Sequence, residues 1–198
     1  CELTKPEARA IAREMGTAIA DKPDSQEICF VTDNDYRRFL REEAGLDEAA
    51  LAGAIVTTRG ETLGKHNGIH NYTIGQRKGL GIAAARPLYV VDLDPETKTV
   101  IVGFDEDVLG AGFTMDGINW VGSEPVREPF RALMKIRYRS PGYAATAYPE
   151  GEGEQAIVAA RVVFDEPVRA ITPGQAAVAY DEATGESVLM GGWIRRRI

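Results

Sequence analysis

Residues 130–139 have the sequence FRALMKIRYR, in which apolar and basic side chains alternate. Such alternation is typical of a half-buried strand, because successive side chains of a strand point to opposite faces. The expected core face carries Ala132, Met134, Ile136 and Tyr138. The expected outer face carries Arg131, Leu133, Lys135, Arg137 and Arg139. The pattern therefore predicts one strand over residues 130–139.

The flanking sequence extends this strand into a barrel. Apolar runs at residues 143–148, 155–164, 176–180 and 187–190 predict further strands, and the Pro-Gly and Thr-Gly pairs between them are typical of turns. Short strands at this spacing predict a closed β-barrel over residues 104–198.

The residues before the barrel divide into two parts. Residues 41–103 predict a small β-rich module, in which two strands flank the hairpin sequence Asp94-Pro95-Glu96-Thr97-Lys98. Residues 1–40 predict a helix that begins at Thr4, with Glu7 at the spacing of a capping box. The apolar run at residues 28–31 suits a buried strand. The expected fold class is therefore mainly β, with a short α/β segment at the start.

Composition and charge restrict the functions that the chain can have. The chain has 198 residues, of which 44% are hydrophobic and 27% charged, as in globular proteins. No apolar run approaches the roughly 20 residues of a membrane helix and no secretory signal is visible, so we expect a cytoplasmic protein with no membrane partner. The formal net charge of −7 opposes binding of nucleic acid by the chain as a whole. RNA binding therefore needs a local basic surface, and DNA is not an expected partner.

Cys29 is the candidate nucleophile. It follows the polar residues 21–27 and lies in the apolar run at residues 28–31. A thiolate beside a cleft can carry sulfur or exchange a disulfide if it is exposed and its pKa is lowered. The alternative is a small buried side chain, which is how most free cysteines behave, and spacing alone favours it. No role is expected for Cys1, the other cysteine.

Three other motifs carry weaker signals. His66 and His70 have the spacing of a helical metal site, but the glycines around them disfavour a helix, and we expect no metal. Residues 75–81, GQRKGLG, form a basic loop that either holds phosphate or is a solvated turn. Arg137 and Tyr138 suggest an RNA contact, with arginine on phosphate and tyrosine on an unpaired base. The alternative places Tyr138 in the core.

Taken together, these blocks resemble bacterial tRNA-specific 2-thiouridylases. The block around Cys29 and the loop at residues 75–81 are the most specific. The full set, in chain order, is residues 4–7, 22–31, 36–40, 64–68, 72–81, 89–92, 137–139 and 172–176. The resemblance covers essentially the whole chain.

That family thiolates the wobble uridine of certain tRNAs. The resemblance implies that ATP with Mg²⁺, held by an N-terminal domain with a Ser-Gly-Gly-type loop, adenylates the C2 oxygen of uracil. Cys29 matches the cysteine that receives a persulfide from a sulfur-relay donor protein. A first cysteine then forms a disulfide with it as the thiolated base is released. Arg137, Tyr138 and Gln175 match positions at which the family's C-terminal barrel contacts tRNA.

The chain departs from the family's pattern because it has no Ser-Gly-Gly loop and no second cysteine at a catalytic position. The resemblance implies that residues 1–40 are the end of the catalytic domain, residues 41–103 a central β-rich domain, and residues 104–198 the tRNA-contacting barrel. Alone, the chain is expected neither to bind ATP nor to thiolate RNA. The resemblance favours part of a sulfurtransferase over two other hypotheses, a stand-alone non-catalytic RNA-binding barrel and a purely structural interaction module.

Overall fold

The computed structural model describes most of the chain after residue 48 and part of the chain before it. The described residues are 3–17, 20, 21, 31, 35, 38, 39, 42, 45, 47, 49–121, 124–151 and 157–198. They belong to two compact units, residues 1–47 and residues 48–198, and each unit is described by itself. Among the described residues, no helix is long and apolar enough to cross a membrane.

The first unit contains the helix α1, Lys5–Glu14, which confirms the predicted start. The backbone N–H and the hydroxyl of Thr4 both donate to the Glu7 carboxylate at 2.6 Å, as the capping-box spacing predicts. Of the predicted strand at residues 28–31, only Val31 is among the described residues, so residues 28–30 with Cys29 lie outside them.

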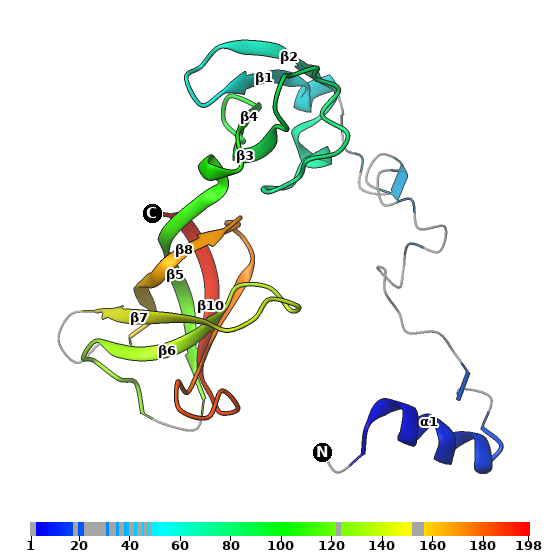
Figure 1. Ribbon diagram of the computed structural model, residues 1–198, viewed down its shortest axis with the longest axis vertical. Helices are drawn as coiled ribbons and strands as arrows, with labels where there is room; N and C mark the ends of the chain where they lie inside the picture. The colour runs from blue at the N-terminus through cyan, green and yellow to red at the C-terminus, as the bar shows by residue number, and fades with distance from the viewer. Residues whose placement is uncertain are drawn as a thin grey trace. The chain divides into compact units, whose positions relative to one another are not determined.

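The second unit begins with a four-stranded sheet (Figure 1). Its strands are β1 Gly53–Thr57, β2 Thr62–His66, β3 Tyr89–Asp94 and β4 Thr99–Gly103, in the order β2-β1-β4-β3. The predicted hairpin between β3 and β4 is confirmed, and Asp94 holds its turn by accepting the N–H groups of Glu96 and Thr97. Valines of β3 and β4 pack on Ile55 to form a separate small core.

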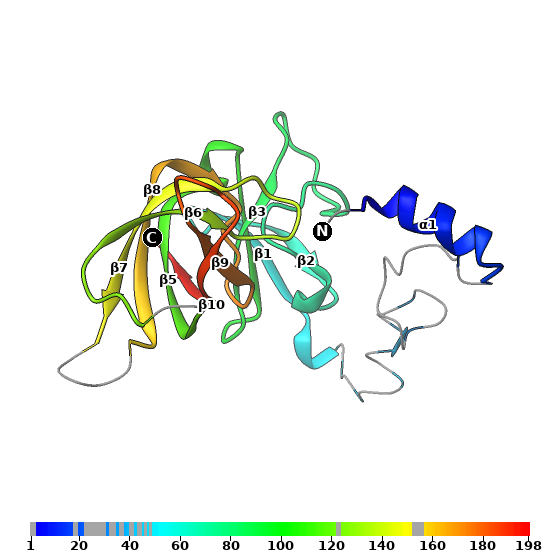
Figure 2. The same cartoon turned by 90° about the horizontal axis from the view of Figure 1, so that it is seen from below.

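The rest of the unit is a closed six-stranded barrel, seen from two sides in Figures 1 and 2, which confirms the predicted architecture. Its strands are β5 Leu109–Trp120, β6 Phe130–Lys135, β7 Tyr143–Glu150, β8 Ala159–Arg169, β9 Ala176–Tyr180 and β10 Val188–Arg197. Neighbouring strands are antiparallel, in the closed order β10-β5-β8-β7-β6-β9. Phe113, Met134 and Ile194 are among the fully buried side chains inside it.

The sheet and the barrel pack against each other at the end of β8. Ala170 belongs to the core of the sheet, and the next residue, Ile171, belongs to the core of the barrel. Beside them, the Arg169 guanidinium pairs with Asp105 and lies 4.6 Å from the ring centre of Tyr89. Short 3₁₀ turns at Ala49–Leu51, Ile69–Asn71 and Glu106–Val108 complete the described elements.

The prediction of one strand over residues 130–139 is confirmed to Lys135 and wrong after it. The strand β6 ends at Lys135, and residues 136–140 form a turn. The turn is closed by Ser140, whose backbone N–H donates to the Arg137 carbonyl at 3.1 Å and whose hydroxyl donates to the same oxygen at 2.9 Å. Ser, Pro and Gly in sequence after Arg139 favour a turn over a strand, and they override the alternation.

Candidate nucleic-acid interface

Tyr138 stands at the tip of the turn between β6 and β7. Its side chain is 97% exposed, whereas Ala132, Met134 and Ile136 before it are buried. The alternative that places Tyr138 in the core is therefore wrong, because the turn breaks the alternation after Ile136. An exposed tyrosine ring on a hydrogen-bonded turn offers a flat face on which an unpaired base can stack.

Arg137, in the same turn, is tied to the end of β8. Its guanidinium donates to the carbonyl oxygen of Ala170, and the remainder of this exposed side chain faces solvent. Thr172 donates its hydroxyl to the same oxygen at 3.0 Å. Ala170 has a φ of 54°, in the left-handed region, and its backbone N–H donates to Val108. This contact was not predictable from the sequence, because nothing in the sequence marks Ala170 as a partner of Arg137.

Gln175 closes the turn that begins at Thr172. Its backbone N–H donates to the Thr172 carbonyl, and its carbonyl accepts the N–H of Ile194 on β10 at 2.8 Å. Gly174, with a φ of 82°, supplies the left-handed residue that the turn requires. The Gln175 side chain is exposed and makes no hydrogen bond to a described residue. Arg137 and the turn of Gln175 therefore meet at the Ala170 carbonyl oxygen, which accepts from both Arg137 and Thr172.

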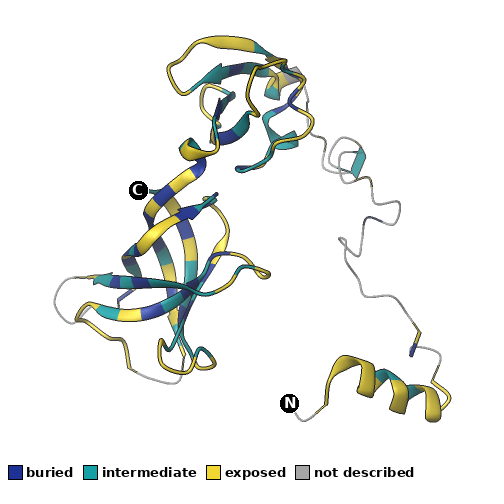
Figure 3. Ribbon diagram, in the orientation of Figure 1, coloured by how far each residue is buried: buried dark blue, intermediate teal, exposed yellow. Residues whose placement is uncertain are grey.

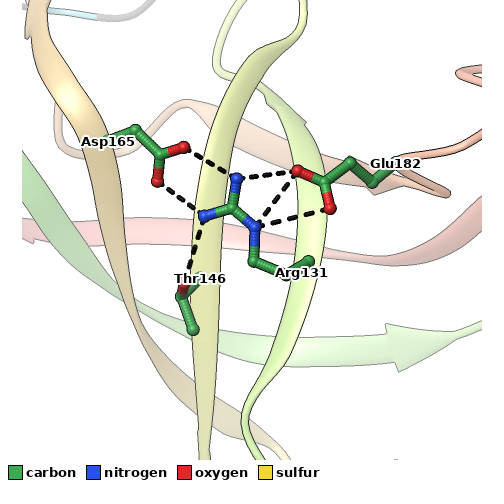
Figure 4. Close-up of polar contacts among 4 residues, drawn as sticks. All are labelled: Arg131, Thr146, Asp165 and Glu182. Carbon is green, nitrogen blue, oxygen red and sulfur yellow. Dashed lines mark hydrogen bonds and ion pairs between the residues drawn. The ribbon is translucent and has the colours of Figure 1, made fainter.

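The basic face predicted around residues 131–139 is smaller than the sequence suggests. The Arg131 guanidinium forms ion pairs with Asp165 at 2.6 Å and with Glu182 at 2.7 Å (Figure 4). Hydrogen bonds from Arg131 lower the pKa of Asp165, and the two carboxylates raise the pKa of Arg131. Lys135 lies 4.9 Å from the ring centre of Tyr180. Arg131 and Lys135 are therefore engaged within the barrel.

The sequence predicts that His66 and His70 do not lie on a common helix, and the structure agrees. His66 ends β2 and is buried, and its Nδ1 accepts the N–H of Gly68 at 3.1 Å while its Nε2 lies 3.0 Å from the carbonyl oxygen of Lys98. His70 lies in the 3₁₀ turn that follows. Both nitrogens of its ring are buried and have no hydrogen-bond partner among the described residues.

The loop at residues 75–81 is a compact turn. The Gln76 side chain closes it, because its Oε1 accepts the N–H of Thr73 at 3.0 Å and its Nε2 donates to the Lys78 carbonyl at 2.9 Å. The backbone N–H of Gly75 donates to Val90, and that of Gln76 donates to Thr73. These N–H groups therefore do not point at a ligand as those of a phosphate-binding loop do.

Cys29, the predicted nucleophile, lies outside the described residues together with most of residues 22–37. Its role stays a prediction.

Comparison with known proteins covers nearly the whole chain. Three family models match, a tRNA methyl transferase HUP domain over residues 1–33, a tRNA methyl transferase PRC-barrel domain over residues 37–104, and an aminomethyltransferase beta-barrel domain over residues 110–194.

Curated relatives match over the same region. The tRNA-specific 2-thiouridylase MnmA of Symbiobacterium thermophilum is 53% identical over 170 residues, which are 86% of this chain and 42% of the relative. That of Solibacter usitatus is 47% identical over 199 residues, 98% of this chain and 52% of the relative. MnmA 2 of Syntrophus aciditrophicus is 41% identical over 211 residues, 100% of this chain and 60% of the relative. The chain thus spans about half the length of the curated relatives it matches.

Proposed function

Because the chain belongs to the tRNA-specific 2-thiouridylase family, we propose that it is part of an enzyme that replaces the C2 oxygen of the wobble uridine of tRNA with sulfur. One observation supports an RNA-binding role for these residues in particular. Arg137 and the turn of Gln175 meet at Ala170, and Tyr138 is exposed beside Arg137.

We assign a separate contact to each of the three residues. Arginine has five N–H donors, and Arg137 keeps most of them after it donates to Ala170, so it binds a phosphate. Tyr138 stacks on an unpaired base. The Gln175 amide, which has both donor and acceptor groups, binds the sugar or a base edge.

We assign the sulfur-carrying role to Cys29. A sulfur-relay protein hands a persulfide to its Sγ, and the terminal sulfur of this persulfide attacks C2 of the activated uracil. The C2 oxygen leaves with AMP as the new carbon–sulfur bond forms. A second thiol of the enzyme then attacks Sγ of Cys29, which breaks the sulfur–sulfur bond, forms a disulfide and leaves the sulfur on the base.

ATP with Mg²⁺ supplies the AMP that turns the C2 oxygen into a leaving group. The backbone N–H groups of Gly75 and Gln76, which open the glycine-rich loop at residues 75–81, bond to the chain itself and do not hold the phosphates of ATP. No step is therefore assigned to ATP held by these residues. The proposal keeps residues 1–40 as the end of the catalytic domain, residues 41–103 as a central domain, and residues 104–198 as the tRNA-contacting barrel.

The salt dependence of tRNA binding tests the RNA-contacting role. Replacing Arg137 by Ala is expected to weaken tRNA binding and to reduce the slope of log K against log salt by about one unit, because one phosphate contact is lost. Arg137→Lys keeps the charge and is expected to keep the slope. Arg161→Ala removes an arginine that packs on the Tyr148 ring of β7 and is the matched control, with an unchanged slope.

The other hypotheses give different results in this experiment and in cells. A purely structural module shows no salt-dependent binding of tRNA by the unaltered chain, and that result overturns the proposal. If Arg137→Ala has the same tRNA affinity and the same salt slope as the unaltered chain, Arg137 is not part of the interface. A stand-alone RNA-binding barrel binds tRNA in the same way. If the chain is such a barrel, cells with a Cys29 variant still contain thiolated nucleosides.

A further inference from the structure

The loop at residues 75–81 starts in contact with the residue that holds Arg137. Gly75 has a φ of 87°, and a Cβ at this position would lie 2.8 Å from the Cβ of Ala170. The backbone N–H of Gly75 donates to Val90 on β3 at 2.8 Å. The start of the loop is therefore fixed between the edge of the sheet and Ala170.

Ala170 joins this loop to both turns of the candidate interface. Its side chain faces Gly75, and its carbonyl oxygen accepts the Arg137 guanidinium and the Thr172 hydroxyl. In addition, Ile74 and Pro173 line one cavity of about 500 Å³. Three segments that are distant in the sequence, around Gly75, Arg137 and Gln175, therefore lie side by side.

The loop presents two cations between anchored residues. Ile74, just before the loop, and Leu80, near its end, are buried, and the Gln76 amide bonds to the backbone across it. Arg77 and Lys78 are exposed between these anchors, and neither side chain forms an ion pair, hydrogen bond or ring contact with a described residue. Arg131 and Arg169, by contrast, pair with carboxylates of the protein. The charges of Arg77 and Lys78 are thus directed outward.

The charge pattern of the sequence fits this arrangement. The chain carries a net charge of −7, yet residues 62–91, 129–149 and 167–180 contain no Asp or Glu. These three stretches contain Gly75, Arg137 and Gln175, so the segments that meet around Ala170 are the acid-free parts of an acidic protein. A local positive field is what a polyanionic partner requires.

From this we propose that Arg77 and Lys78 bind the phosphate backbone of the same tRNA that contacts Arg137, Tyr138 and Gln175. The inference rests on the proposed function and extends the RNA-binding surface from the barrel onto the central module. The loop contributes affinity but reads no base, because both side chains act on phosphate.

Two measurements on the 198-residue chain test this. The double variant Arg77→Ala, Lys78→Ala is expected to reduce the slope of log K against log salt for tRNA by about two units, one for each phosphate contact. The matched control, Arg59→Ala with Lys65→Ala, removes one arginine and one lysine near β2, at the opposite edge of the sheet from β3, and is expected to keep the slope. Bound tRNA is also expected to protect Lys78, and not Lys65, from acetylation of its amine.

The outcomes separate the inference from the proposed function. An unchanged slope in the loop variant, together with a reduced slope for Arg137→Ala, overturns the inference and leaves the barrel interface in place. Equal losses in the loop variant and in the control overturn it as well, because the effect is then one of net charge. No salt-dependent binding by the unaltered chain overturns both. Thermal melting that matches the unaltered chain confirms that each variant is folded.

Discussion

Gly75 and Ala170 lie in close contact where the sheet meets the barrel. Gly75→Ala is expected to destabilise the protein by about 1–3 kcal/mol through its left-handed backbone, with a further loss from contact with the Ala170 side chain. Urea unfolding of the variant measures the total loss of unfolding free energy from both effects. Gly79→Ala is the matched control, because Gly79 has a φ of 79° but its nearest neighbouring atom lies 3.8 Å from the added Cβ. Equal destabilisation of the two variants would contradict a close contact at Ala170.

Tyr138 is the residue at which binding and stability separate most cleanly. Its side chain is 97% exposed, so Tyr138→Ala is expected to leave the thermal midpoint unchanged. The same variant is expected to lose about 1–3 kcal/mol of tRNA-binding free energy if its ring stacks on one base. Tyr138→Phe keeps the ring and is expected to retain most of the affinity. If Tyr138→Phe loses as much tRNA-binding free energy as Tyr138→Ala, the hydroxyl and not the ring makes the contact.

At the scale of elements, Arg131 ties β6 to β8 and to the residues that follow β9 (Figure 4). Asp165 has a pKa below its ordinary value of 3.8 because it accepts hydrogen bonds from Arg131. A carboxyl group whose pKa is lowered by folding stabilises the protein above its unfolded pKa, and this contribution is lost as the pH falls through the folded pKa. Arg131→Met is therefore expected to lower the thermal midpoint near pH 7. This decrease is expected to become progressively smaller as the pH falls below about 4.

The matched control for this pH series is Arg161→Met. Arg161 lies 4.4 Å from the ring centre of Tyr148. A contact with an aromatic ring does not titrate, so the difference between this variant and the unaltered chain is expected to stay constant with pH. A constant difference for Arg131→Met between pH 7 and pH 2 would contradict the role assigned to its carboxylate partners.

The strands that the sequence predicts are those whose inward positions carry side chains. The alternation at residues 130–135 and the run at residues 176–180 both correspond to strands, β6 and β9. The longest strand, β5, is not predicted, because its inward positions include Gly110 and Gly112. A Cβ on Gly112 would lie 2.1 Å from the Val162 carbonyl oxygen, so the close approach of β8 requires glycine there. The same requirement removes the apolar residue that would have revealed the strand.

At the scale of the whole molecule, the sequence predicts the architecture better than the contacts of the site. A closed barrel follows from strand spacing and turn residues, and burial alternates along its strands as expected (Figure 3). The meeting of residues 75, 137 and 175 at Ala170 does not follow, because it depends on how strands far apart in the sequence close the barrel. The pairing of Arg131 with Asp165, 34 residues away, has the same cause.

The sulfur-carrying role proposed for Cys29 is tested by the amount of thiolated nucleosides in the tRNA of cells. Cys29→Ser is introduced in the gene that encodes this chain, tRNA is digested, and 2-thiouridine nucleosides are quantified by mass spectrometry. Loss of these nucleosides is expected with Cys29→Ser at unchanged protein level, whereas Cys1→Ser, the matched control, is expected to retain them. Unchanged thiolation with Cys29→Ser would contradict the claim, and a non-catalytic RNA-binding barrel would then be the better description.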